Sequence, residues 1–217
     1  MLSIVDLIER GTFDIETASY LALKIQHGAS FITGAVPGGG GKTTVMGALL
    51  NLIPPNMEII PCENSSIIED AKSLPSPVCA LAHEISQGYY YCYIWGEVLR
   101  EFFTLIEYGH LCATNLHADT LSQTKDQICR ENGVQETDFN RIDFFIFLET
   151  SGGLMNKTIK ASSIMCFDSG RNQHIQLNSE TTEQASSEYR EYKSLFTHLL
   201  KNGINTIEEV RKEIVAM

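Results

Sequence analysis

Two spacings of apolar residues alternate along the chain and predict its helices and strands. Apolar residues three and four positions apart predict amphipathic helices over residues 2–11 and 14–28, and both segments end at a glycine suited to a left-handed cap. A short β-type run at 30–33 leads into a stretch of glycines, and a helical pattern at 42–53 ends at two prolines. The chain therefore begins with two helices, followed by a strand, a loop and a helix.

Strands and helices continue to alternate through the middle of the sequence. The pattern predicts strands at 57–64, 89–95 and 110–116, and helices at 78–88, 99–109 and 120–132. The tyrosine-rich segment 89–95 is too apolar for an edge strand, so we expect its rings to pack in the core. Alternating elements with buried strands are typical of a parallel sheet that is covered by helices on both faces.

The rhythm changes after residue 138. Three strands at 141–150, 158–168 and 174–178 are joined by short segments, which favours antiparallel hairpins. Two helical patterns, at 189–203 and 206–217, close the chain. We therefore expect an α/β fold in which a largely parallel sheet is followed by antiparallel strands and C-terminal helices.

The glycine loop, residues 38–44, joins a predicted buried strand to a predicted helix. Its residues are Gly38, Gly39, Gly40, Gly41, Lys42, Thr43 and Thr44. Glycines adopt positive φ and turn several backbone N–H groups toward one anion, and the helix N-terminus adds partial positive charge. Lys42 adds a full charge, and Thr43 offers a hydroxyl to Mg²⁺. The loop therefore predicts a P-loop that holds the phosphates of ATP with Mg²⁺.

One position departs from the usual P-loop pattern. The pattern places a glycine six residues before the lysine, where this chain has Val36. Two arrangements accommodate it: the first glycine is Gly34 in a longer loop, or Pro37 fixes the turn so that Val36 needs no positive φ. The sequence does not choose between them.

Three further side chains follow predicted strands. Glu63 ends one strand, Glu97 follows the next and His117 follows a third. The carboxyl ends of strands line the ligand crevice of doubly wound sheets, so these residues are expected to converge on the phosphates. A carboxylate orients the attacking water in hydrolysis, and an imidazole can donate to the γ-phosphate. The predicted catalytic residues are therefore Glu63, Glu97 and His117.

Composition narrows the range of partners. The chain has 217 residues, 43% of them hydrophobic, and a formal net charge of −11, which argues against a broad nucleic-acid-binding surface. No apolar run is long enough for a membrane helix, so we expect a cytosolic protein that at most docks peripherally on a membrane. The six cysteines form no CxxC pair and are expected to be reduced core residues.

The order of "GGGGKTT", "IIPCEN", "IWGEVLR" and "GHLCATNLHAD" resembles the ATPases of type II and type IV secretion and of pilus assembly and retraction. The resemblance covers nearly the whole chain and implies a RecA-like P-loop NTPase. It implies that Lys42 and Thr43 are the Walker A pair and Glu63 the acidic-box glutamate. It further implies that Glu97 is the Walker B general base and that His117 contacts the γ-phosphate.

The resemblance implies one nucleotide-binding domain over residues 1–217. Its parts are N-terminal helices at 1–28, the P-loop core at 29–134, antiparallel strands at 135–180 and C-terminal helices at 181–217. It also implies that the chain assembles into a hexameric ring or works with a separate partner domain.

Three features depart from the family pattern. Asn64 stands where the acidic box has aspartate, and Arg100 only approximates the usual arginine after the glycine-glutamate pair. The family's N-terminal domain, which carries arginines that reach the phosphates, has no counterpart in the chain. Arg100, Arg130 or Arg141 of a neighbouring subunit could replace them. Because an arginine finger contributes a factor of about 10³ to 10⁵, hydrolysis is expected to be slow.

Two functions follow from these features. The first is a Mg²⁺-dependent ATPase of the secretion and pilus motor type. The alternative is a nucleotide-gated binding or assembly module in which hydrolysis is vestigial. A small-molecule kinase ranks third because the sequence offers no obvious arginine-bearing lid.

Overall fold

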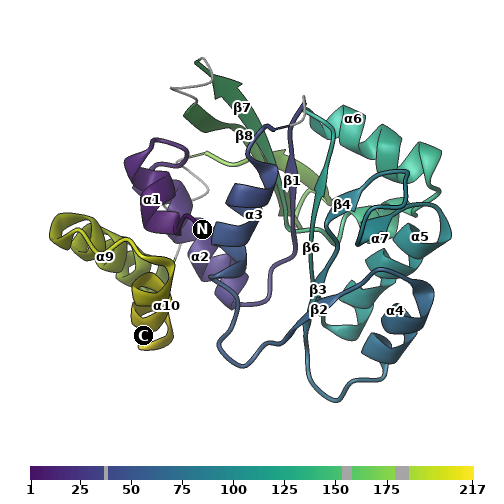
Figure 1. Cartoon of the computed structure of the whole chain (residues 1–217), viewed down its shortest axis with the longest axis horizontal. Helices are drawn as coiled ribbons and strands as arrows, with labels where there is room; N and C mark the ends of the chain where they lie inside the picture. The colour runs from purple at the N-terminus through teal and green to yellow at the C-terminus, as the bar shows by residue number, and fades with distance from the viewer. Residues whose placement is uncertain (37–38, 153–157, 179–185) are drawn as a thin grey trace.

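The computed structural model describes residues 1–36, 39–152, 158–178 and 186–217, and in them a central sheet separates two layers of helices (Figure 1). The main path of the sheet contains, in spatial order, β2 (Ile59–Pro61), β3 (Cys79–Leu81), β6 (Leu111–Leu116), β1 (Phe31–Gly34), β7 (Phe144–Ser151), β8 (Thr158–Asp168) and β9 (Gln173–Gln176). The strands from β2 to β7 are parallel to their neighbours, whereas β8 and β9 extend the sheet in antiparallel pairs. Two short strands, β4 (Glu84–Ile85) and β5 (Tyr93–Ile94), lie off this path, and β4 pairs with both β5 and β6.

Helices cover both faces of the sheet (Figure 1). One layer consists of α1 (Ile4–Glu9), α2 (Ile15–Gln26), α3 (Lys42–Leu50), α9 (Ser187–Asn202) and α10 (Ile207–Val215). The opposite layer consists of α4 (Ser65–Lys72), α5 (Glu97–Thr104) with the 3₁₀ segment η1 (Leu105–Tyr108), α6 (Leu121–Lys125) with the π-helical segment η2 (Asp126–Glu131), and α7 (Glu136–Phe139). The predicted α/β architecture with a mostly parallel sheet is confirmed.

Alternate residues of the central strands fill two separate cores. In β1, Phe31 packs with the layer that contains α2 and α3, whereas Ile32 packs with the layer that contains α4 and α5. In β7, Phe144 and Ile146 face the first layer and Phe145 faces the second. Successive side chains of a strand point to opposite faces, so a strand covered on both sides is apolar at most positions. This requirement explains the continuous apolar runs in the sequence.

The predicted helix at 78–88 is wrong. This stretch forms β3 and β4 and runs between them through a bend at His83. Cys79 and Ala80 are fully buried on opposite faces of the sheet. A short apolar run buried on both faces has no two-residue alternation, so its pattern does not differ from that of a buried helix.

The predicted strand at 89–95 is largely wrong. Only Tyr93 and Ile94 form a strand, and Tyr89, Tyr90 and Tyr91 are exposed rather than packed in the core. Cys92 has a φ of +55°, which interrupts the extended conformation ahead of Tyr93. The backbone therefore turns at this point, despite the high β propensity of tyrosine.

The other strand predictions agree better with the structure. β8 is antiparallel to both β7 and β9 as expected, although β7 also pairs in parallel with β1. The helix α4 was not predicted. It begins after Asn64, whose side-chain oxygen accepts the Ile67 N–H at 3.1 Å and caps the helix.

Gly34 is required at the end of β1. A Cβ atom there would lie 2.5 Å from the Ala118 carbonyl oxygen and 2.9 Å from Cδ1 of Phe147. We expect Gly34→Ala to lower the free energy of unfolding by roughly 1–3 kcal/mol, because the backbone must shift to relieve the contacts. Urea denaturation measures the change.

Gly47 in α3 provides the matched control. The nearest atoms to its added Cβ belong to the flexible Met1 side chain, and alanine favours a helix by up to about 1 kcal/mol relative to glycine. Gly47→Ala should therefore leave stability unchanged or raise it. Equal losses in the two variants would contradict the proposed close approach at Gly34.

Buried thiols make stability depend on alkaline pH. All six cysteines are free, and all except Cys129 are buried. Desolvation is the largest cause that raises the pKa of Cys62 to about 11, of Cys79 to about 12 and of Cys129 to about 11, from an ordinary value of 9.0. Folding thus favours the protonated thiols, and this contribution is present below pH 9 and lost as the pH rises toward 11 to 12.

We expect the urea midpoint, measured with a reducing agent present, to fall between pH 9 and pH 11. Cys79→Ala should flatten the fall, because it removes one raised thiol pKa and leaves an apolar residue in place. A midpoint that stays constant over this pH range would contradict the thiol burial.

Candidate nucleotide site

A cavity of about 380 Å³ lies at the edge of the sheet where β1 and β6 end. Its lining residues come from the glycine loop, from β4 and β5, and from the position after β6, and are Gly39, Gly40, Gly41, Lys42, Thr43, Thr44, Glu84, Tyr93 and His117. The fold therefore gathers polar groups from four separate segments at one place.

The glycine loop has the backbone shape that its sequence predicts. Gly39 and Gly41 have φ values of +80° and +86°, a region that residues with a side chain rarely adopt. A Cβ on Gly41 would also lie 2.3 Å from Cδ1 of Ile159. Gly41 precedes α3 and supplies no side-chain cap, so the first amides of the helix are available to an anion. Gly38 lies outside the described residues.

Val36 fits without a glycine's conformation. Among the described residues, the non-glycine positions with positive φ are Cys92 and Asn172, so Val36 has an ordinary φ. Its N–H donates to Oδ1 of Asp119 at 2.7 Å. Gly34, the first glycine of the longer-loop arrangement, is the last residue of β1. Pro37, which the other arrangement uses to fix the turn, lies outside the described residues. The backbone at position 36 therefore does not need the positive φ that a glycine would allow.

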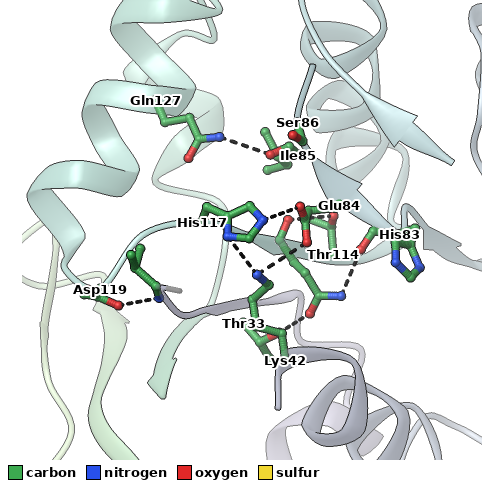
Figure 2. A network of polar contacts seen from close by, with 12 residues as sticks. Thr33, Lys42, His83, Glu84, Ile85, Ser86, Thr114, His117, Asp119 and Gln127 are labelled. Carbon is green, nitrogen blue, oxygen red and sulfur yellow. Dashed lines mark hydrogen bonds and ion pairs between the residues drawn. The ribbon is translucent and has the colours of Figure 1, made fainter. Parts of the chain in front are cut away.

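Lys42, Glu84 and His117 contact one another at the cavity (Figure 2). The Lys42 Nζ atom lies 3.4 Å from Oε2 of Glu84 and 3.2 Å from Nδ1 of His117, and Nε2 of His117 lies 2.8 Å from Oε1 of Glu84. Because Nδ1 accepts from the lysine ammonium, the ring proton of a neutral His117 is on Nε2, which faces the carboxylate. The Lys42 and Glu84 side chains are 7% and 8% exposed, whereas that of His117 is 43% exposed.

Hydrogen bonds to the backbone on both sides of Glu84 hold its main chain in place (Figure 2). The His83 carbonyl accepts from Nδ2 of Asn115 at 2.8 Å, and the Ile85 carbonyl accepts from Nε2 of Gln127 at 3.0 Å. The fully buried Asn115 also accepts a hydrogen bond from the Thr33 hydroxyl in β1. These contacts tie the segment that carries Glu84 to the strand that leads into the glycine loop.

The structure brings together only some of the residues predicted from the sequence. Lys42, Thr43, Thr44, His117 and the described glycines of the loop line one cavity, whereas Glu63 and Glu97 are absent from its described lining. Glu63 is exposed after the edge strand β2, and Glu97 is exposed at the first turn of α5. The catalytic roles of Glu63 and Glu97 stay predictions.

Glu84 is the acidic residue that sequence analysis missed. It was placed in a predicted helix, although it follows an apolar run just as His117 does. Had residues 78–82 been interpreted as a strand, the rule that strand ends carry site residues would have selected it.

The three candidate arginines interact within this chain. NH1 of Arg100 donates to the Asn132 carbonyl at 2.8 Å, Arg130 pairs with Asp126, and Arg141 pairs with Glu107. The described lining of the cavity contains no arginine.

Among the described residues, no helix has the length and apolar composition that crossing a bilayer requires.

Comparisons with known proteins identify the fold. No sequence model of a known family matches the chain. A stretch of 78 residues, 36% of the chain, is 40% identical to the uncharacterized protein MJ0900 of Methanocaldococcus jannaschii and covers 13% of that protein.

Two solved structures resemble most of the chain. The VirB11 ATPase of the Brucella suis type IV secretion system, in complex with sulphate, aligns with a TM-score of 0.52 and 16% identity over 75% of this chain and 54% of that one. The Legionella pneumophila ATPase DotB aligns with a TM-score of 0.51 and 11% identity over 88% and 58%, respectively. The chain thus spans a little over half the length of these two proteins and shares the fold of their aligned parts.

Proposed function

We propose that the chain binds ATP with Mg²⁺ at the glycine loop and hydrolyses it slowly. The observation that carries this proposal is the convergence of Lys42, Glu84 and His117 on the cavity that begins at the uncapped end of α3. The two solved structures that share this fold are both named as ATPases, which supports the same reaction class.

The proposed binding of ATP depends on positive charge near the phosphates and on oxygen donors to Mg²⁺. The first amides of α3 and the Lys42 ammonium offer positive charge to the β- and γ-phosphates. Thr43 lines the cavity, and a hydroxyl oxygen is a donor that suits Mg²⁺. Bound Mg²⁺ would neutralise charge on the phosphates.

The hydrolytic half rests on Glu84. When phosphate draws Lys42 away, the carboxylate becomes free to accept a proton from a water molecule that attacks the γ-phosphorus, while the bond from that phosphorus to the bridging oxygen breaks and ADP leaves. The Nε2–H group of His117 can then donate to a γ-phosphate oxygen. We therefore assign the role of general base to Glu84 in place of Glu97.

We expect slow turnover because the candidate arginines do not reach the described lining of the cavity. Arg100, Arg130 and Arg141 bind within their own chain, and an arginine finger is worth a factor of about 10³ to 10⁵. A neighbouring subunit of a ring, or a separate partner domain, would supply the missing charge. In this proposal the chain serves a motor of the secretion or pilus type.

A nucleotide-gated binding module is the second candidate. The absence of arginine from the described lining of the cavity favours it, because binding needs only the loop and Lys42, whereas fast hydrolysis needs more. In this case ATP would control assembly or docking on a partner.

Phosphate release by Glu84→Gln and Glu97→Gln tests the mechanism. We expect Glu84→Gln to lower turnover at least about 100-fold while ATP remains bound, because the amide cannot accept the proton of water. Glu97→Gln is the matched control, since it makes the same chemical change at an exposed position, and should keep the parent rate.

The two measurements have distinct outcomes. A rate that survives Glu84→Gln but is lost in Glu97→Gln would overturn the assignment of Glu84. Tight binding of ATP by the parent chain without phosphate release above background would favour the binding module over the ATPase.

A further inference from the structure

Tyr93 lies directly across from Glu84 in the small sheet beside the cavity. The two residues are partners in the parallel pair of β4 and β5, and both line the cavity. Partner residues on adjacent strands project their side chains to the same side of the sheet. Tyr93 therefore reaches the site from a segment that none of the predicted motifs included.

Stacked rings fix the orientation of the Tyr93 side chain. Its ring lies nearly parallel to that of His83, at 12° with centroids 5.7 Å apart. The Tyr90 ring also contacts the Tyr93 ring, with an angle of 51° between the two planes and 5.2 Å between the centroids. An aromatic side chain has few rotatable bonds, and these two ring contacts restrict them further. The phenol group is thus held in one position beside the carboxylate.

The Tyr93 phenol lies beside Glu84 at the cavity. Desolvation is the largest cause that raises the pKa of Tyr93, and the nearby negative charge of Glu84 raises it further. The phenol therefore stays protonated near neutral pH and offers a hydroxyl donor beside the carboxylate.

Three groups surround the Glu84 carboxylate: Lys42 and His117 form ion pairs with it, and Tyr93 lies across from it at the cavity. In the proposed reaction, on which this inference rests, Lys42 and His117 both turn to the phosphates. Their contacts with Glu84 then weaken or break. Tyr93 carries no positive charge that phosphate would attract, so its contact can persist.

We propose that Tyr93 is a positioning residue that keeps the Glu84 carboxylate oriented toward the attacking water after Lys42 and His117 have moved to the nucleotide. Backbone contacts at His83 and Ile85 fix where the Glu84 main chain lies, and the phenol fixes where its carboxylate points. The stack on His83 makes this donor rigid.

Steady-state hydrolysis by Tyr93→Phe tests the role. The variant keeps the ring and its stack but loses the hydroxyl, so we expect kcat to fall roughly tenfold while KM for ATP stays within about twofold. Tyr89→Phe makes the same change in the same loop at a fully exposed side chain and should match the parent chain. Thermal denaturation of both variants checks that the fold is intact.

Each outcome separates this inference from the proposed function. A parent chain that does not hydrolyse ATP overturns the proposed hydrolysis, and the role of Tyr93 with it. A parent chain that hydrolyses ATP, with an unchanged kcat in Tyr93→Phe, overturns the role of Tyr93 alone. Loss of kcat together with a large rise in KM would also overturn it, because it would indicate a general disturbance of the site.

A second measurement tests the contact without turnover. 3-Fluorotyrosine placed at position 93 reports the ionisation of the phenol by ¹⁹F NMR during a pH titration. In Glu84→Gln the negative charge that raises the pKa of Tyr93 is removed, so the titration should move to lower pH. A titration that does not move would show that the two groups do not interact and would overturn the proposal.

Discussion

The buried charge of Lys42 is the constraint on which the site depends. A lysine side chain that is 7% exposed requires an anionic partner, because an unpaired buried charge is costly. Glu84 supplies this partner in the structure, and His117 joins the pair. A phosphate is the natural substitute for the carboxylate, since it carries more negative charge and the helix N-terminus lies beside it. The same pair thus explains why the site is stable and how it can respond to a nucleotide.

The sheet makes this pairing possible. Parallel strands bring their carboxyl ends to one edge, so the glycine loop after β1 and His117 after β6 start from paired positions, Gly34 and Leu116. The short β4 pairs with β6 at this same residue, Ile85 with Leu116, which places Glu84 at the same edge. Asn115 links these strands through Thr33 and His83. The geometry of the charges is therefore a direct consequence of strand order.

Much of this arrangement could be predicted from the sequence, and the failures have identifiable causes. The glycines, Lys42 and His117 were found because each follows a strand that its apolar residues mark clearly. Glu84 was missed because Cys79 and Ala80 are buried on opposite faces, and a strand without alternation resembles a helix. Glu97 was selected because it follows a glycine after an aromatic run; it is absent from the described lining of the cavity, and its catalytic role stays a prediction. Contacts between distant segments, such as Tyr93 with Glu84, leave no local pattern.

The central claim is that Lys42 exchanges its carboxylate partner for the phosphates of ATP. Isothermal titration calorimetry of Mg·ATP with the parent chain and with Lys42→Met tests it most directly, because methionine keeps an unbranched side chain only one heavy atom shorter and removes the charge. The account predicts that the parent chain binds and that Lys42→Met binds at least roughly tenfold more weakly. Equal affinity in the two proteins, or no binding by the parent chain, would contradict it.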